Sequence, residues 1–249
     1  MKILICLSNV PDTTTKIKFV DNNTKFDTNG VQWIINPWDE LALTRAIELK
    51  EQNPSLIESI IVATVGLQDA EATMRKALAV GADKALRINA EPKDAYYVAY
   101  QLAQVIQEEK PDLILAGIES SDYNGNAVGN MLAEILDIPS ISSVSKVDFA
   151  DSKLMINREI DGGSESIEAS APLIAVVQKG IAIEPRIPAM RGIMMARTKP
   201  LVVAEPKDCE LLTEFVSYTL PPTKAKVKLV DAENVGELVR LLHEEAKVI

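Results

Sequence analysis

Histidine is nearly absent from this sequence, and cysteine and aromatic residues are also scarce. The 249 residues include one histidine, two cysteines and only 4% aromatic residues. Because His243 lies alone near the C-terminus, acid–base catalysis or metal binding by histidine is hard to build. Cys6 and Cys209 are too far apart in the sequence for a metal-binding spacing or a disulfide framework. We therefore expect neither a metal site nor a self-contained set of catalytic residues.

Long apolar runs and an excess of basic residues are missing as well. No apolar stretch approaches the roughly 20 residues of a membrane span, so we expect no membrane insertion. The first residues already form a strand-like run at positions 1–5, which leaves no space for a signal peptide and predicts a cytoplasmic protein. The net charge of −10 argues against nucleic acid as the main partner.

What is present is the composition and rhythm of an ordinary globular α/β protein. Apolar residues make up 47% of the chain and charged residues 25%. Short apolar runs alternate with helical periodicity, which predicts a doubly wound, mainly parallel sheet with helices on both faces. The expected strands are residues 3–7, 60–65, 84–88 and 113–116, and the expected helices are residues 37–49, 69–80, 95–110 and 128–136.

The rhythm changes after Pro139. Three short alternating segments, residues 142–149, 153–159 and 165–169, predict antiparallel hairpins, and residues 172–177 restore a buried strand. We expect a hairpin ribbon over about 142–170 that is added to the sheet and leaves one edge free. We expect residues 1–205 to form one α/β domain of the type that binds nucleotides.

The stretch that organises the chain is the polar loop after the strand at 113–116. Gly117 ends this strand, and helical periodicity resumes at Val128. In open parallel sheets, ligands bind beyond the carboxyl ends of the strands, and a helix N-terminus favours an anion. The loop therefore favours a phosphate-bearing ligand held by backbone amides, although an ordinary polar connection with a helix cap stays open. No glycine fingerprint or P-loop lysine decides between them.

A second site segment is the run Asn36-Pro37-Trp38-Asp39-Glu40. Pro37 suits the first turn of a helix, and Asn36 before it is expected to be the N-cap. Trp38 then lies at a helix start beside the presumed site. It is interpreted either as a ligand contact or as a core tryptophan.

Two later segments are typical of surfaces for other proteins. Residues 184–200 carry four basic side chains against Glu184, together with Met190, Ile193, Met194 and Met195. Methionine-rich surfaces adapt to partners, although these side chains could instead pack inward on a short helix at 189–197. Residues 206–249 are expected to form an extended arm and an amphipathic helix that starts at Asn234. Such an arm docks on another subunit or folds back on its own domain.

Several motifs together make the chain resemble the β (small) subunit of electron-transfer flavoproteins. They occur in the order of that family and cover nearly the whole sequence. The matching pieces are Pro11-Asp12, residues 36–40, 77–83, 117–129 and 158–163, and Glu184-Pro185-Arg186 leading to Ile193-Met194.

The resemblance implies a subunit without catalytic residues of its own. It implies a heterodimer with an α subunit that holds most of the FAD, while this chain closes over the flavin and binds AMP structurally. Electrons would arrive from acyl-CoA and related dehydrogenases and leave to an electron-transfer flavoprotein:quinone oxidoreductase or another acceptor. The arm at 206–249 would pack on the α subunit. In such proteins the cofactor carries the redox chemistry.

The resemblance also implies roles for individual residues. Trp38 stands where the family has an aromatic residue near the flavin, and Glu159 matches an acidic residue that pairs with the partner's flavin domain. Residues 184–200 match the loop that docks dehydrogenases, with Arg186 at its start and Met190 at its apolar anchor, followed by Ile193, Met194 and Met195. The AMP contacts would be Cys6, Asn36, Pro37, Trp38, Asp39, Val65, Gly117, Ile118, Glu119, Ser120, Ser121, Asp122, Tyr123, Asn124, Gly125, Asn126, Ala127 and Val128.

Three alternatives stay open. Ile118-Glu119 replaces the usual Lys-Gln of the family, which weakens the electrostatic attraction for AMP. Some family members hold a second FAD in this pocket and bifurcate electrons. The sequence of their loop usually differs from that of residues 122–129 here. A nucleotide-cleaving enzyme of the same fold is disfavoured by the absence of a plausible base. A nucleotide-binding module that only homodimerises is disfavoured by the docking loop and the arm.

Overall fold

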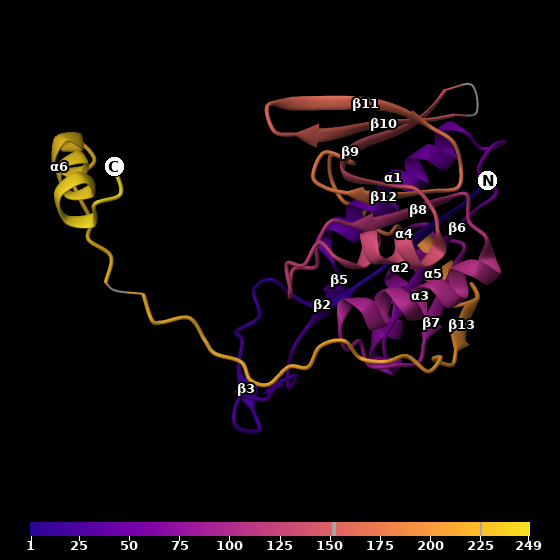
Figure 1. The fold of residues 1–249 in the computed structure, drawn as a ribbon, viewed down its shortest axis with the longest axis horizontal. Helices are drawn as coiled ribbons and strands as arrows, with labels where there is room; N and C mark the ends of the chain where they lie inside the picture. Colours follow the sequence, from indigo (N-terminus) through magenta and orange to yellow (C-terminus); the bar gives the residue numbers. More distant parts are fainter. Residues whose placement is uncertain (151–152, 225) are drawn as a thin grey trace.

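The computed structural model describes residues 1–150, 153–224 and 226–249, and one large sheet dominates these residues (Figure 1). Its strand order is β11-β10-β9-β12-β8-β1-β6-β7-β13. The strands are β1 Lys2–Cys6, β6 Ser59–Val65, β7 Lys84–Ile88, β8 Leu113–Gly117, β9 Ser140–Ala150, β10 Lys153–Ile160, β11 Gly163–Ala169, β12 Leu173–Val177 and β13 Leu201–Ala204.

The sheet is parallel from β9 to β13 and doubly wound, as the sequence predicts. Each crossover places a helix on one of the two faces. The buried side chains of α1 and α2 pack in one core cluster and those of α3 and α4 in the other. The bounds are α1 Pro37–Gln52, α2 Glu71–Val80, with a short 3-10 turn at Gln68–Ala70 before it, α3 Ala95–Glu109 and α4 Val128–Leu136.

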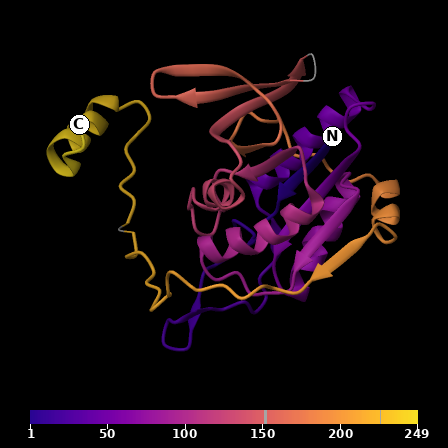
Figure 2. The ribbon, with the colours of Figure 1, turned by 45° about the vertical axis from the view of Figure 1, so that its right-hand side comes forward.

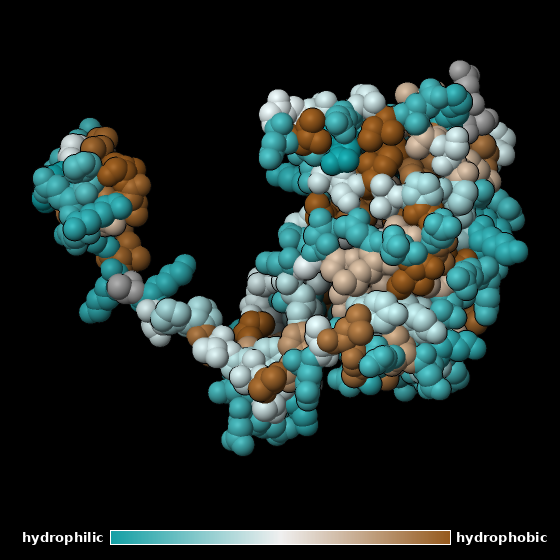
Figure 3. Space-filling model, viewed as in Figure 1, coloured by the Kyte–Doolittle hydropathy of each residue, from teal (hydrophilic) through white to brown (hydrophobic). Residues whose placement is uncertain are grey.

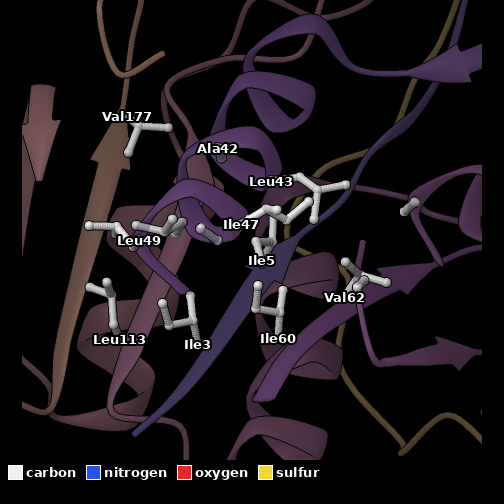
Figure 4. Packing of buried hydrophobic residues seen from close by; sticks show 14 of the residues in the cluster. Ile3, Ile5, Ala42, Leu43, Ile47, Leu49, Ile60, Val62, Leu113 and Val177 are labelled. Carbon is white, nitrogen blue, oxygen red and sulfur yellow. The ribbon is translucent and has the colours of Figure 1, made fainter. Parts of the chain in front are cut away.

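The central strands are apolar throughout because helices cover both of their faces. In β1, Ile3 and Ile5 pack toward α1, whereas Leu4 and Cys6 pack toward α3 and α4. Figure 4 shows Ile3 and Ile5 beside side chains of neighbouring strands and of α1, which together form a continuous layer.

The helix caps agree only in part with the prediction. Asp94 caps α3 by accepting a hydrogen bond from the Tyr97 N–H (2.7 Å), as expected of an N-cap. Asn36 occupies the N-cap position of α1, but its side chain makes no capping hydrogen bond. The N-cap position predicted for Asn36 is therefore confirmed, but its side chain is engaged elsewhere.

Two small antiparallel sheets interrupt the region between β1 and α1. One pairs β2 (Asn9–Pro11) with β5 (Trp33–Ile35), and the other pairs β3 (Phe19–Val20) with β4 (Lys25–Phe26). The connection between β1 and α1 is thus a folded excursion beside the main sheet (Figure 1).

The predicted hairpin ribbon extends the sheet at its other end. β9 pairs parallel with β12 and antiparallel with β10, which in turn pairs with β11. β11 is the last strand in the order and has no further neighbour among the described residues. Figure 2 shows the β10–β11 hairpin projecting from the body of the molecule.

The C-terminal part begins beside the sheet and ends away from it. Helix α5 (Met190–Ala196) is followed by β13, after which the chain becomes an extended arm. The arm runs past α3 and β3 and ends in α6 (Val235–Arg240), which continues as a π-helical turn over Leu241–Ala246 (Figures 1 and 2). Apolar side chains gather on one side of this terminal helix (Figure 3).

None of the helices in the described part of the chain has both the length and the apolar character needed to cross a membrane.

Candidate functional site

The carboxyl ends of four parallel strands meet at one edge of the sheet. Cys6, Val65, Gly117 and Val177 end β1, β6, β8 and β12 respectively. The polar loop at 118–127 follows β8 and connects to α4 at this edge. The structure therefore places the loop where parallel sheets bind ligands.

Asn36 holds the first half of the loop. Its side-chain Nδ2 donates to the Glu119 carbonyl (2.8 Å), and its Oδ1 accepts from the Ser121 N–H (3.1 Å). Asn36 is only 1% exposed, so both hydrogen bonds are shielded from water. The side chain that the sequence assigns to capping α1 instead shapes the loop.

Asp39 holds the strand ends on either side of the loop. Its carboxylate accepts from the Ser8 N–H (2.8 Å) and the Gly117 N–H (3.0 Å). The carboxylate is buried, and burial raises the pKa of Asp39 to about 7, although the hydrogen bonds from Ser8, Asn36 and Gly117 lower it. A Cβ at Gly117 would collide with Asp39 Oδ1 and lie 2.9 Å from the Trp38 Cβ.

The N-terminus of α4 lies at the same edge. Its N-cap residue is Ala127, and within the described chain no side chain caps the helix. The first helical hydrogen bond runs from the Met131 N–H to the Ala127 carbonyl (2.9 Å). Gly129 lies close to β12, since a Cβ there would come within 2.8 Å of Val176 Cγ2. The first-turn amides of α4 therefore have no side-chain cap in the described residues, and such amides can bind an anionic group.

An open cleft of about 720 Å³ lies beside the loop, a volume typical of ligand sites. Trp38 forms part of the wall of this cleft, so the structure places it at the candidate site and not in the core. Across the cleft, the Gln178 Nε2 donates to the Glu159 carboxylate (2.7 Å). The lining residues are Trp38, Ile118, Glu119, Asn126, Glu159, Gln178, Lys179 and Gly180.

Cys6 and Val65 do not line this cleft. They pack beneath it in the cluster that faces α3 and α4, together with Ile118 and Val128. Burial, with a smaller contribution from Asp39, raises the pKa of the Cys6 thiol. The thiol is therefore kept neutral, and the structure places Cys6 as a packing residue of the site floor.

The middle of the loop lies on the surface. Asp122, Tyr123, Asn124 and Gly125 are exposed, and Ser120 and Ser121 are half-buried. The Asn124 N–H donates to the Ser120 carbonyl (2.8 Å), which closes a turn within the loop. The ring of Tyr123 contacts the ring of Phe215 in the arm, with the ring centroids 5.4 Å apart.

The methionine-rich segment presents its apolar side chains to solvent. Met190 and Met194 are 77% and 70% exposed, and Ile193 and Met195 are also exposed. Helix α5 packs on α2, because Gly192 allows contact with the Ala79 carbonyl. Inward packing therefore does not explain these side chains.

Basic residues anchor both ends of this segment to the body. The Lys199 Nζ donates to the Leu78 (2.9 Å) and Ala82 (2.6 Å) carbonyls. Arg186 forms a bidentate ion pair with Glu51, with both distances 2.8 Å. The Arg186 guanidinium is thus engaged within the chain. Glu159 does not join this surface, since it lies in the cleft with Trp38.

Sequence reasoning did not identify Gln178, Lys179 and Gly180 as site residues. They follow β12, whose parallel pairing with β8 places them beside the loop. The buried strand at 172–177 is visible in the sequence, but its neighbour in the sheet is not. The strand order is the signal that would have located them.

Across the described ranges, no group of three or more His, Cys, Asp or Glu side chains is arranged to hold a metal ion.

Comparisons with known proteins give a consistent result over the whole chain. The model of the electron transfer flavoprotein domain matches residues 23–209. An electron transfer flavoprotein subunit beta of Bacillus subtilis is 37% identical, with both chains covered completely. The protein of the same name from Syntrophomonas wolfei is 36% identical over 94% of this chain and 92% of its own. The human protein of that name is 31% identical over 100% of this chain and 99% of its own.

Proposed function

Because the chain belongs to the electron transfer flavoprotein β-subunit family, we propose that it is the small subunit of a heterodimeric electron carrier. The observation that supports this most strongly is the match to β subunits along the full length of the chain. Its partner is then an α subunit that holds most of a shared FAD. We further propose that the protein acts in the cytoplasm.

We propose that AMP binds at the loop 118–127 as a structural ligand. The uncapped first turn of α4 supplies N–H donors for its phosphate. The Glu119 and Asp122 carboxylates oppose an anion, so the backbone amides and the helix dipole must supply the attraction. Asn36 and Asp39 keep the loop in place from below.

The cleft is the proposed face toward the flavin of the α subunit. The flavin supplies the redox chemistry when it is bound. Trp38 contributes a flat apolar wall to the cleft, and Glu159, held by Gln178, contributes a fixed acceptor for a basic side chain of the partner. The residues of this chain therefore position and shield the flavin.

Helix α5 and the arm are the proposed contact surfaces for other proteins. The exposed Met190 and Met194 suit the apolar surface of an acyl-CoA or related dehydrogenase. The terminal helix exposes Val235, Leu238 and Val239, which suit burial against the α subunit. Electrons then leave to a quinone oxidoreductase or another acceptor.

Nucleotide content tests this proposal. The chain is co-expressed with its candidate α subunit, the complex is purified, and the nucleotides released on denaturation are identified and counted. One FAD and one AMP per heterodimer would support the proposal. Two FAD molecules would move the protein to the bifurcating type, and ATP turnover by this chain alone would favour an enzyme.

A further inference from the structure

Four aromatic side chains form a continuous ladder beside the candidate nucleotide loop. Phe19 stacks on Tyr218 with ring centroids 4.8 Å apart and planes 12° apart. Tyr218 stacks on Phe215 (5.8 Å, 15°), and Phe215 contacts Tyr123 (5.4 Å, 40°). The ladder uses two of the four phenylalanines and two of the five tyrosines of the chain. In a sequence so poor in aromatic residues, this clustering calls for an explanation.

The ladder joins three parts of the chain that are distant in sequence. Phe19 belongs to β3 of the N-terminal excursion, Tyr123 to the loop after β8, and Phe215 and Tyr218 to the arm. Figures 1 and 2 show the arm running past α3 to β3 before it leaves the body. We call residues 211–218 the clasp.

Hydrogen bonds fix the path of the arm up to the end of the clasp. Gln101 pairs with the backbone of Lys207 through two hydrogen bonds of 2.7 and 2.9 Å. The Asp94 carboxylate, which caps α3, also accepts from the Leu212 and Thr213 N–H groups (3.0 Å each). The Tyr218 N–H donates to the Asn23 carbonyl (2.8 Å).

These hydrogen bonds to the body are confined to the arm up to Tyr218. In the described residues after it, the arm makes no hydrogen bond to the body. The clasp is therefore the last part of the arm that is hydrogen-bonded to the body in the described residues, and the terminal helix beyond it exposes apolar side chains. The clasp thus connects the end of the arm to the loop, since Phe215 contacts Tyr123.

From this arrangement we infer that the clasp restrains the tip of the loop and couples nucleotide retention to assembly with the larger subunit. The inference rests on the proposed function, since it takes the loop as the nucleotide site. When the terminal helix docks, the arm loses freedom and the clasp closes more often over the loop. Because coupling is reciprocal, a bound adenylate also favours the docked arm.

The first test measures amide hydrogen exchange of residues 120–126 in the full, nucleotide-free chain. Phe215→Leu removes the stacking ring and keeps an apolar side chain. Because one aromatic pair contributes a factor of roughly 2 to 10, we expect exchange at the loop tip to accelerate by that factor. Tyr123→Leu should give the same acceleration, and the double variant should add little to it.

The matched control is Tyr100→Leu. Tyr100 pairs with Tyr96 on α3 (6.3 Å between ring centroids), so the control also removes one aromatic contact, away from the loop. It should leave loop exchange unchanged. Exchange that is equal in the wild type, Phe215→Leu and Tyr123→Leu would overturn the clasp, whatever the loop binds.

The second test compares the chain alone with the heterodimer. Assembly should slow loop exchange in the wild type and less so in Phe215→Leu, and AMP should dissociate about 2- to 10-fold faster from the variant heterodimer. An unchanged dissociation rate would overturn the coupling. If the wild-type heterodimer bound no adenylate while Phe215→Leu still accelerated loop exchange, the proposed AMP site and its coupling to assembly would fail, and only the restraint of the loop by the clasp would stand.

Discussion

At the scale of single residues, Asp39 is the buried carboxyl that connects the elements around the candidate site. Its two carboxylate oxygens accept the Ser8 and Gly117 N–H groups, so it joins the ends of β1 and β8 to the start of α1. Burial nevertheless makes the charged form costly, which is why its pKa is raised. This balance gives a pH dependence with a definite sign.

We predict that Asp39 lowers the stability of the chain as pH rises from about 4 to about 7. Its pKa is about 7 in the fold, whereas an unfolded Asp titrates near 3.9. Between these values the native state retains a proton that the unfolded state has lost. The contribution of Asp39 to the free energy of unfolding is therefore complete below about pH 4 and is lost as pH rises through about 7. This contribution changes by up to about 4 kcal/mol.

Urea unfolding of the wild type and Asp39→Asn across this pH range checks the prediction. The free energy of unfolding of the variant should depend less on pH, because the variant has no carboxyl at this position. Asp161→Asn removes a charge at an exposed turn and controls for net charge. Parallel curves for the wild type and Asp39→Asn would contradict the assignment.

A second prediction concerns Gly117. An alanine Cβ would collide with Asp39 Oδ1 and crowd Trp38, so Gly117→Ala should destabilise the chain by about 1–3 kcal/mol. Gly125→Ala is the control in the same loop, since a Cβ there meets nothing within 4 Å. Its free energy of unfolding should stay within about 0.5 kcal/mol of the wild type. Equal free energies of unfolding for the two variants would contradict the prediction, because the neighbours of Gly117 would then have moved to admit the Cβ.

At the scale of elements, helix α5, which we propose as a docking surface, is held in place while its apolar side chains face outward. Arg75 donates to the Ala196 (2.7 Å) and Lys199 (2.8 Å) carbonyls, and Lys199 donates back to the C-terminal end of α2. These bonds fix the end of the helix without using Met190 or Met194. The surface is therefore pre-organised, which lowers the entropic cost of binding a partner.

We predict that Met190→Gln lowers the rate of electron acceptance from an acyl-CoA dehydrogenase. The substitution places a polar group in the docking surface and should raise KM about 10-fold, equivalent to about 1.4 kcal/mol. Steady-state reduction of the heterodimer by the dehydrogenase and its substrate is the measurement. Met190→Leu keeps an apolar side chain and should retain a KM near that of the wild type. Met190→Gln with unchanged KM would place the docking surface elsewhere.

Elements with a clear period were predictable from the sequence, and contacts between elements were not. The apolar runs and caps located the parallel strands and helices α1 to α4, because periodicity and capping are local properties. The N-cap position of Asn36 was predictable, but its side-chain partners Glu119 and Ser121 were not, because they lie 83 and 85 residues away. Gln178 and Lys179 were missed because only the strand order places β12 beside β8. The site is built from such long-range contacts.

At the scale of the whole molecule, a folded body is joined to an arm that leaves it. The body has two cores, one on each face of the sheet, and the arm after Tyr218 contributes no hydrogen bond to it in the described residues. The exposed apolar side of the terminal helix is unfavourable in water. This architecture suits a subunit that completes its fold on a partner.

We predict that a chain ending at Tyr218 keeps the folded body and loses its partner. Its thermal unfolding midpoint should lie within a few degrees of the full chain, roughly the shift that a change below 1 kcal/mol produces. Analytical ultracentrifugation with the α subunit should show separate subunits where the full chain forms a complex. A truncated chain that assembled as tightly as the full chain would remove the arm from the interface.

The central claim is that this chain completes an electron carrier, and reduction of the shared flavin tests it most directly. The heterodimer is mixed rapidly with a catalytic amount of acyl-CoA dehydrogenase and its substrate, and the flavin absorbance is followed. We predict that the absorbance bleaches in the heterodimer and that no such signal arises from this chain alone. A heterodimer that carries flavin and stays oxidised with every dehydrogenase of this class would contradict the account.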